Sequence, residues 1–220
     1  MFQYVLFDLD GTLTDPKAGI TSCVQYALED AGIKEPDLDK LEPFIGPPLA
    51  DSFREFYGFD DEQIKCAIDK YHERFDQKGI FENEIIEGIP ELLKALKDAG
   101  RRVSIASSKP RPLVIRILEH FEIAQYFDTV VGSEFDGRFA TKEAVVEEAL
   151  RQLVPSVYEK EDVAMVGDRK FDIQGARAHG LTGIGVSFGY AGEHELEDAG
   201  ADYIVDTVEE LQRLLLQGCL

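Results

Sequence analysis

The stretch that decides the fold is Phe7-Asp8-Leu9-Asp10-Gly11-Thr12-Leu13-Thr14-Asp15, which follows a largely apolar run over residues 2–6. Asp8 and Asp10 stand two residues apart at the end of a predicted strand, so their side chains project to the same side. In open α/β sheets, ligands bind beyond the carboxyl ends of the strands. Two ionised carboxylates this close repel each other, so the arrangement calls either for a divalent cation or for a raised pKa on one of the two acids. Taken alone, the stretch fits either a cation site or an acidic surface turn.

Short apolar runs alternate with helical periodicity along most of the chain. Apolar residues repeat at helical spacing in residues 89–96 and again in residues 114–121. The runs between such helices lack polar alternation, which is typical of strands buried on both faces of a parallel sheet. The predicted strands are Phe2–Phe7, Arg102–Ser107, Thr129–Gly132, Val163–Val166, Gly183–Val186 and Asp202–Val205. This alternation predicts an α/β fold with a Rossmann-like, doubly wound parallel sheet.

Residues 17–82 break the alternation, because they contain helical patterns and no convincing strand. Within them, apolar residues fall on one face of a helix predicted over residues 60–77. We therefore expect a small α-helical domain inserted after the first strand. The expected organisation is an α/β core domain of residues 1–16 and 83–220, interrupted by this helical domain.

Three later segments add polar groups near strand ends. Ser107 and Ser108 lie between a predicted strand and a helix, where a hydroxyl and free backbone N–H groups make an anion site. Lys142 begins a helix, where its charge opposes the helix dipole and indicates another task. Asp168 follows another strand, and Asp172 lies one helical turn beyond it. Alone, each serine also fits a helix N-cap and the lysine a surface position.

Together these segments assemble one chemical set. It contains three acids, Asp8, Asp10 and Asp168, with the hydroxyl of Ser107 and the ammonium of Lys142. Hard oxygen ligands suit Mg²⁺ rather than zinc, and no His or Cys clusters with these acids in the sequence. The sequence therefore predicts a Mg²⁺ site beside an anion-binding lysine.

The net charge of the chain indicates which classes of binding partner to expect. The 220 residues include 23 basic and 43 acidic side chains, for a formal net charge of −20. Since phosphate backbones and anionic lipids are held by Lys and Arg, we expect neither nucleic acid nor a membrane as a partner. No apolar run approaches the roughly 20 residues that span a bilayer, and no signal-peptide pattern precedes the first strand. Cys23, Cys66 and Cys219 form no metal or disulfide pattern, so we expect inert thiols in a cytoplasmic protein.

The combined motifs resemble those of the haloacid dehalogenase superfamily, and specifically its phosphatases. Residues 8–15 match the first motif of that family, Ser107 the second, Lys142 the third, and Gly167-Asp168 with Asp172 the fourth. The resemblance covers most of the chain, and its first motif is highly specific. It implies the same core fold and a phosphatase activity.

The resemblance also implies roles for the acids. Asp8 is expected to be the nucleophile that forms an aspartyl-phosphate, and Asp10 the acid that protonates the leaving oxygen and then activates water. A Mg²⁺ ion is expected on the side chains of Asp8 and Asp168 and on the backbone carbonyl of Asp10. These roles suit the chemistry, because a covalent carboxylate intermediate divides one difficult step into two easier ones.

The remaining motif residues are expected to bind the phosphoryl group. Ser107 and Ser108 would hold its oxygens, and Lys142 would neutralise its charge while Asp172 orients the lysine. Many phosphoglycolate phosphatases carry Lys-Pro at the third motif, whereas this chain has Thr-Lys-Glu there. Lys109 follows the second motif and competes with Lys142 for the same role.

The helical insertion resembles the α-helical cap of the phosphoglycolate-phosphatase-like branch. Residues 43–49 resemble the loop that this branch points into its active site, and Gly46 and Pro47 are the expected substrate contacts. Two prolines after a glycine stiffen the loop and permit a close approach to a ligand. A plain helix–helix connection is the alternative. Four aromatic residues fit either stacking on a nucleobase or packing the core of the cap: Phe44, Phe53, Phe56 and Tyr57.

The sequence and the resemblance together predict a Mg²⁺-dependent phosphatase that acts on a small phosphorylated metabolite. Phosphoglycolate and nucleoside 5′-monophosphates are the leading substrates, since residues 79–83 also resemble bacterial proteins called 5′-nucleotidases. The alternatives are an inorganic pyrophosphatase, a phosphotransferase similar to β-phosphoglucomutase, and a catalytically inactive binding protein of the same fold. The oligomeric state stays open between a monomer and a homodimer.

Overall fold

A computed structural model describes residues 2–154 and 157–218. Contacts divide the chain into two compact units. One unit is formed by the chain before Asp15 together with the chain from Ile85 onward, and the other by Asp15–Glu84. No helix within the described residues is long and apolar enough to cross a membrane.

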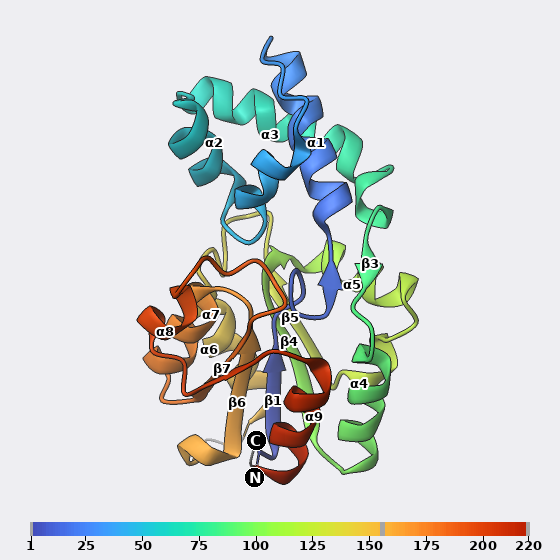
Figure 1. The fold of residues 1–220 in the computed structure, drawn as a ribbon, viewed down its shortest axis with the longest axis vertical. Helices are drawn as coiled ribbons and strands as arrows, with labels where there is room; N and C mark the ends of the chain where they lie inside the picture. Colours follow the sequence, from blue (N-terminus) through green and yellow to red (C-terminus); the bar gives the residue numbers. More distant parts are fainter. Residues whose placement is uncertain (1, 155–156, 219–220) are drawn as a thin grey trace. The chain divides into compact units, whose positions relative to one another are not determined.

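The first unit contains a six-stranded parallel sheet in the order β5-β4-β1-β6-β7-β8. Its strands are β1 (Tyr4–Phe7), β4 (Arg102–Pro110), β5 (Thr129–Ser133), β6 (Val163–Gly167), β7 (Thr182–Val186) and β8 (Tyr203–Val205). Figure 1 shows β1 inside the sheet, between β4 and β6. The chain therefore moves to one side of β1 first and returns to its other side later. This is the predicted doubly wound sheet, in which ligands bind where the strand order reverses.

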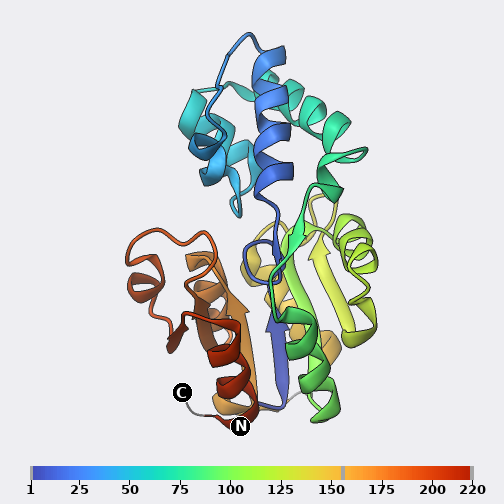
Figure 2. The ribbon, with the colours of Figure 1, turned by 45° about the vertical axis from the view of Figure 1, so that its right-hand side comes forward.

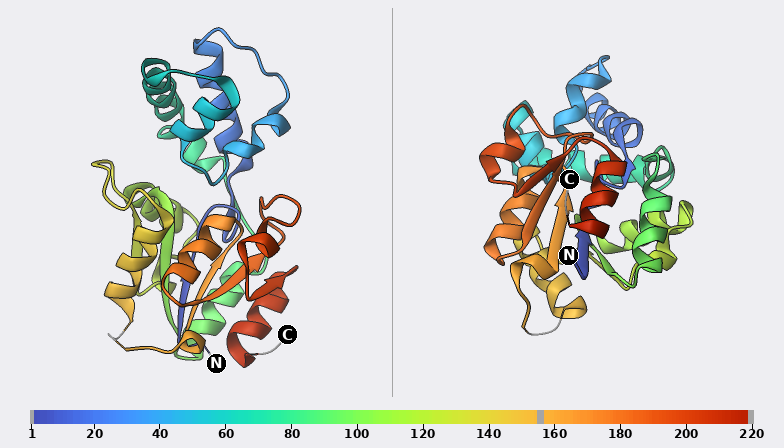
Figure 3. Two further views of the ribbon diagram at one scale, coloured as in Figure 1. Left: turned by 90° about the vertical axis from the view of Figure 1, so that its left-hand side faces the viewer. Right: turned by 60° about the horizontal axis from the view of Figure 1, so that its bottom comes forward.

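Helices cover both faces of this sheet (Figure 2, Figure 3). On one face α6 and α7 contact each other, and α6 contacts β4 while α7 contacts β6 and β7. On the other face α4 packs beside α9. The helices of this unit are α4 (Ile89–Asp98), α5 (Arg111–His120), α6 (Lys142–Leu153), α7 (Lys170–Ala178), α8 (Glu195–Ala199) and α9 (Val208–Gln217), with 3₁₀ turns η3 (Ala124–Tyr126) and η4 (Lys160–Asp162).

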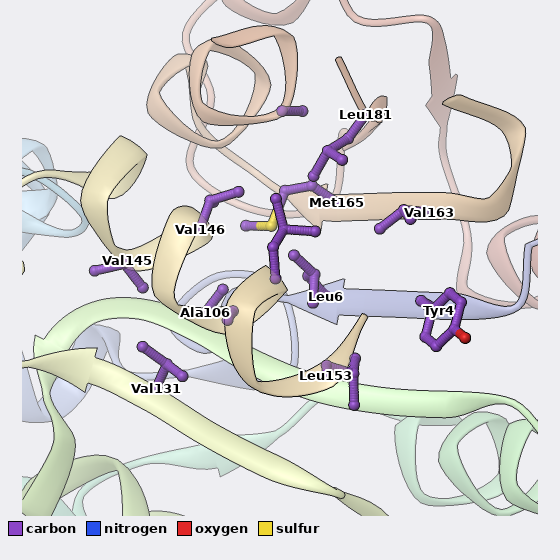
Figure 4. Packing of buried hydrophobic residues seen from close by; sticks show 13 residues of the cluster. Tyr4, Leu6, Ala106, Val131, Val145, Val146, Leu153, Val163, Met165 and Leu181 are labelled. Carbon is purple, nitrogen blue, oxygen red and sulfur yellow. The ribbon is translucent and has the colours of Figure 1, made fainter. Parts of the chain in front are cut away.

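The central strand is buried on both faces. Tyr4 and Leu6 belong to the apolar cluster under α6 and α7, which Figure 4 shows together with Met165 from β6. Val5 and Phe7 alternate with them and are fully buried as well. Because successive side chains of a strand point to opposite faces, the apolar run of β1 fills both layers of the core. This packing fixes the end of β1, where the acidic stretch begins.

The second unit is helical. Its elements are α1 (Lys17–Asp30), η1 (Leu38–Phe44), α2 (Leu49–Tyr57), α3 (Asp61–Phe75) and η2 (Gly79–Phe81), and β2 (Thr14–Asp15) pairs with β3 (Glu84–Ile85) where the chain enters and leaves it. Helix α3 begins at a capping box between Asp60 and Gln63, which explains its start at the predicted place. A Cβ atom on Gly19 would lie 2.1 Å from the carbonyl oxygen of Gly79, so only glycine allows this close approach of the chain to α1.

Aromatic residues form the core of the second unit. The ring centroids of Phe44 and Phe53 are 5.0 Å apart in an edge-to-face arrangement, and both side chains are buried. Phe53 stacks on Phe59 at 5.6 Å. Phe56 lies 5.5 Å from Phe44, and its side chain is exposed. Core packing therefore accounts for Phe44 and Phe53, and nucleobase stacking by Phe56 stays a prediction.

The cysteines differ in their surroundings. Cys23 is buried in α1, and burial raises the pKa of its thiol although Arg74 donates a hydrogen bond to its Sγ at 3.2 Å. A protonated, buried thiol is unreactive, as the sequence predicts for Cys23. Cys66 is exposed and free, and Cys219 lies outside the described residues.

Candidate active site

Three buried acids meet at the carboxyl edge of the sheet. Asp8 follows β1, Asp168 follows β6, and Asp172 lies in the first turn of α7. One carboxylate oxygen from each lies within 4.8 Å of the others. They meet because β1 and β6 are hydrogen-bonded neighbours, with the Asp8 N–H donating to the Val166 carbonyl at 2.9 Å. A one-residue shift in this register would turn Asp8 away from the site.

Lys142 supplies the positive charge of this cluster. It is the first residue of α6, and its buried ammonium lies 2.8 Å from Asp8 Oδ1 and 2.8 Å from Asp172 Oδ1. It also donates to the Ala106 carbonyl at 3.0 Å. The hydroxyl of Thr141 caps α6 by accepting from the Ala144 N–H at 3.3 Å, which fixes where the helix begins. The lysine thus faces the acids although a cation in a first turn opposes the helix dipole.

The cluster contains more negative than positive charge. Burial, followed by the charges of Asp172 and Asp8, raises the pKa of Asp168 well above its usual range. Burial and Asp8 also raise the pKa of Asp172 to about 6, although Lys142 acts in the opposite direction. Burial alone would lower the pKa of Lys142, but Asp172 and Asp8 outweigh it and raise that pKa. One ammonium thus faces three carboxylates, and an all-oxygen, acidic donor set of this kind fits a hard divalent cation such as Mg²⁺.

Asp10 has a different partner from Asp8. Its Oδ2 lies 2.5 Å from the ammonium of Lys109, and both side chains are nearly buried. Its Oδ1 is shielded from solvent and has no hydrogen-bond partner among the described residues. The two lysines that competed for one role in the sequence therefore hold different acids, Lys142 with Asp8 and Lys109 with Asp10. The backbone-carbonyl role expected of Asp10 toward Mg²⁺ stays a prediction.

The serines stand in a strand rather than at a helix start. The sequence places the end of this strand at Ser107, but β4 continues to Pro110 with a shift in register, and α5 begins at Arg111. The expected helix N-terminus at the serines is therefore wrong. The physical reason is Pro110, since a proline holds the residue before it in extended backbone. Buried Ser107 still lies at the carboxyl edge of the sheet, where its Oγ accepts from the Lys109 N–H at 3.3 Å, and the Ser108 carbonyl accepts from Ser133 Oγ at 2.8 Å.

The sequence matches the haloacid dehalogenase-like hydrolase family over residues 5–186. The chain belongs to this family. Membership confirms the family predicted from the motifs, and the fold confirms the predicted α/β class. It also makes the protein a hydrolase, since the family is one of hydrolases.

Proteins and crystal structures similar to this chain are known from several bacteria. A 5′-nucleotidase from Pseudomonas aeruginosa is 46% identical over 196 residues, which cover 89% of this chain and 87% of that protein. A tyrosine-protein kinase from Mycobacterium tuberculosis is 38% identical over 216 residues, covering 97% of this chain and 72% of the kinase. The crystal structure of a predicted phosphatase from Clostridium acetobutylicum shares 46% identity and a TM-score of 0.92 over 99% of both chains. The likenesses to the 5′-nucleotidase and to the predicted phosphatase support the phosphatase class.

The haloacid dehalogenase-like site also contains residues that the sequence reasoning missed. Thr12 Oγ1 donates to Asp168 Oδ1 at 3.4 Å, and the backbone N–H of Tyr190 donates to Asp168 Oδ2 at 2.8 Å. Gly11 has a φ of +79°, and a Cβ atom on it would lie 2.1 Å from Asp168 Oδ2. The first-motif turn therefore needs glycine both for its backbone and for room. The contact from Tyr190, which follows β7, is made by a backbone N–H. No side-chain type in the sequence indicates such a contact.

The expected substrate contacts Gly46 and Pro47 belong to the helical unit. They connect η1 with α2, and Gly46 has a φ of +103°, which favours glycine. Pro48 is the N-cap residue of α2, so this proline stands where the next helix starts, which is compatible with a plain helix–helix connection. A substrate contact for Gly46 and Pro47, and a role as cap for the unit, stay predictions.

Proposed function

We propose that this protein is a Mg²⁺-dependent phosphatase that hydrolyses a small phosphomonoester through a covalent phosphoryl-Asp8 intermediate. The observation that carries the proposal is the pairing of buried Asp8 with Lys142 at 2.8 Å, inside a cluster that also holds Asp168 and Asp172. A carboxylate is a weak base but an adequate nucleophile once charge is withdrawn from phosphorus. The family relationship supports this class of reaction.

The residues that would hold Mg²⁺ are the side chains of Asp8 and Asp168 and the backbone carbonyl of Asp10. The fit rests on the donor set, since these atoms are all oxygens and the two carboxylates are buried beside Asp172. When bound, the ion supplies positive charge to the phosphoryl oxygens and lets two anions approach each other. Asp172 keeps its contact with Lys142 in this assignment and orients the lysine.

The first chemical step transfers the phosphoryl group to the enzyme. A carboxylate oxygen of Asp8 forms a bond to phosphorus, and the bond between phosphorus and the ester oxygen breaks. Asp10 gives a proton to the departing oxygen, and Lys142 and Ser107 hold the phosphoryl oxygens. Asp10 is bound to Lys109 in the structure, so we infer that its carboxyl group leaves Lys109 to meet the substrate.

The second step returns the phosphoryl group to water. Asp10 accepts a proton from a water molecule, whose oxygen forms a bond to phosphorus while the bond to Asp8 breaks. Inorganic phosphate leaves and both acids are regenerated. Uncatalysed hydrolysis of phosphomonoesters is among the slowest reactions known. The proposed mechanism divides it into two easier steps through Asp8, with Lys142 balancing the charge.

The proposed substrate class is a nucleoside 5′-monophosphate or phosphoglycolate. The 46% identical relative named 5′-nucleotidase favours the first, and it covers most of both chains. The 38% identical relative named tyrosine-protein kinase favours a second candidate, in which an acceptor hydroxyl replaces water in the second step. The two candidates share the first step and differ in the product, which is inorganic phosphate for one and a new phosphoester for the other.

The test is phosphate release from a panel of compounds. It contains nucleoside 5′-monophosphates, phosphoglycolate, sugar phosphates and pyrophosphate, each with Mg²⁺ or with EDTA, and Asp8→Asn is the control protein. We expect Mg²⁺-dependent release that Asp8→Asn lacks, strongest for one monoester. Release from pyrophosphate alone would favour the pyrophosphatase alternative, and transfer without release the phosphotransferase. Silence on every compound from a folded protein would contradict the proposal.

A further inference from the structure

The segment from Ser187 to Gly192, here called the β7 loop, rests on Asp168. The backbone N–H of Tyr190, in this loop, donates to Asp168 Oδ2 at 2.8 Å. A Cβ atom on Gly189 would lie 2.3 Å from the Asp168 Cβ and 2.5 Å from the Gly11 carbonyl oxygen. With the loop in this place, Asp168 Oδ2 accepts from the Tyr190 N–H, while Asp168 Oδ1 accepts from Thr12 Oγ1 at 3.4 Å. The orientation of Asp168 therefore depends on the position of the β7 loop.

Glu195 fastens the end of this loop. It is the first residue of α8, and its Oε2 accepts from the Gly192 N–H at 3.1 Å. Its Oε1 accepts from the Arg169 Nε at 2.9 Å and from the Lys170 N–H at 2.8 Å. One carboxylate thus joins the β7 loop to the two residues that follow Asp168 in the chain. Asp168 is held from both sides, by its own neighbour and by the loop that covers it.

The contact between Arg169 and Glu195 differs from an ordinary surface ion pair. The two side chains are 14% and 15% exposed, and Arg169 Nη2 also approaches Glu195 Oε2 at 3.4 Å. Exposed ion pairs contribute little because solvent screens them, whereas a shielded, two-point arginine–carboxylate contact fixes geometry. Glu193, the residue that follows the β7 loop, is 91% exposed and contacts only its neighbour His194, at 3.7 Å, among the ion pairs of the described residues.

We propose that Glu195 is a positioning residue for the cation site, which it controls by clamping the β7 loop onto Asp168 through Arg169. The proposal rests on the proposed function, because it assigns Asp168 to Mg²⁺. Glu195 itself touches neither the substrate nor the ion. Residues behind the ligands of a metal typically change its affinity by about 10- to 100-fold when they are replaced.

The test compares Glu195→Gln with the matched control Glu193→Gln. The first variant keeps the size of the side chain and removes the charge of the clamp, and the second removes a solvent-exposed charge two residues away, between the β7 loop and α8. We expect Glu195→Gln to raise the Mg²⁺ concentration for half-saturation about tenfold, with kcat at saturating Mg²⁺ little changed. The same shift should appear in the Mg²⁺-induced rise of Tm, which needs no substrate. Glu193→Gln should match the wild type in both measurements.

A variant of the partner completes the test. If Arg169 and Glu195 act as one clamp, the double variant Arg169→Gln/Glu195→Gln should lose no more Mg²⁺ affinity than either single variant. Wild-type Mg²⁺ affinity in Glu195→Gln, with only a lower Tm in EDTA, would overturn the inference and leave the proposed function standing. A wild-type protein with no Mg²⁺ effect on Tm or on phosphate release would overturn both.

Discussion

The ammonium of Lys142 lies 2.8 Å from Oδ1 of Asp8, and this contact joins the start of α6 to the end of β1. Both groups are buried, and the sheet order brings them together from positions 134 residues apart in the sequence (142 − 8). The lysine lowers the repulsion that a phosphate dianion would meet at a carboxylate. The proposed mechanism requires this contact, because the Asp8 carboxylate and the phosphate it attacks are both negatively charged and a cation must lie beside them.

Asp8→Asn should abolish phosphate release. The amide has nearly the same shape, so the fold should survive, but it cannot form an acyl phosphate and does not carry the charge that attracts the metal. The measurement is inorganic phosphate release at saturating substrate, with circular dichroism as the check on folding. A variant that retains a tenth of the wild-type rate would refute the covalent mechanism.

Lys142→Met should reduce activity at least about 100-fold and destabilise the metal-free protein. Removing one partner of a buried ion pair leaves uncompensated charge, which costs about 3–5 kcal/mol, and here both Asp8 and Asp172 lose their partner. The measurements are kcat and the free energy of unfolding in EDTA.

Lys109→Met is the matched control for that variant, because Lys109 holds Asp10 instead. It should retain more Asp8 phosphorylation than Lys142→Met does, because Asp8 keeps its contact with Lys142, and it should alter both steps in which Asp10 moves a proton. A larger loss of phosphorylation in Lys109→Met than in Lys142→Met would reverse the roles assigned to the two lysines.

Mg²⁺ should stabilise the protein more at about pH 8 than at about pH 5. The folded-state pKa of Asp172 is raised to about 6 and that of Asp168 is raised as well, so the folded state binds more protons than the unfolded state below these values. The free energy of unfolding therefore falls as pH rises from the ordinary carboxyl pKa through the raised folded-state values, because both acids then become charged in the folded protein. A bound cation offsets this loss. Tm with Mg²⁺ and with EDTA across this range measures the effect. A Tm gain that is equal at both ends, or larger in acid, would contradict the site.

Replacing Pro47 and Pro48 with glycine should change substrate preference more than activity on a small generic phosphate ester. The prolines restrict the backbone between η1 and α2, and glycine would release it. The measurement is kcat/KM for the best metabolite and for a small aryl phosphate. Equal losses on both substrates would argue against a specificity role for this loop.

The fold was largely predictable because its strands are short runs of β-branched and aromatic residues. Most observed strand boundaries lie within one or two residues of the predicted ones, as for β7 at Thr182–Val186 and β8 at Tyr203–Val205. The exception is β4, where Pro110 prolongs extended backbone past Ser107. Periodicity identifies a buried strand, but it does not show where a proline delays the following helix.

The site was predictable only where side-chain types announce it. Acids and lysines at strand ends pointed to Asp8, Asp168 and Lys142, which the structure brings together. The β7 loop could not be found this way, because Tyr190 reaches Asp168 through a backbone N–H that any residue possesses. The partner of Asp10 was also open, since spacing along the chain does not decide which of two lysines reaches which acid.

The measurement that tests the central claim most directly is the location of the phosphoryl group during turnover. The enzyme is mixed with its best substrate and Mg²⁺, quenched in acid within the first turnover, digested, and analysed by mass spectrometry. We predict one hydroxylamine-sensitive phosphoryl group on Asp8, absent when EDTA is present and absent in Asp8→Asn. A phosphoryl group on another residue, or steady phosphate release by Asp8→Asn, would contradict the account.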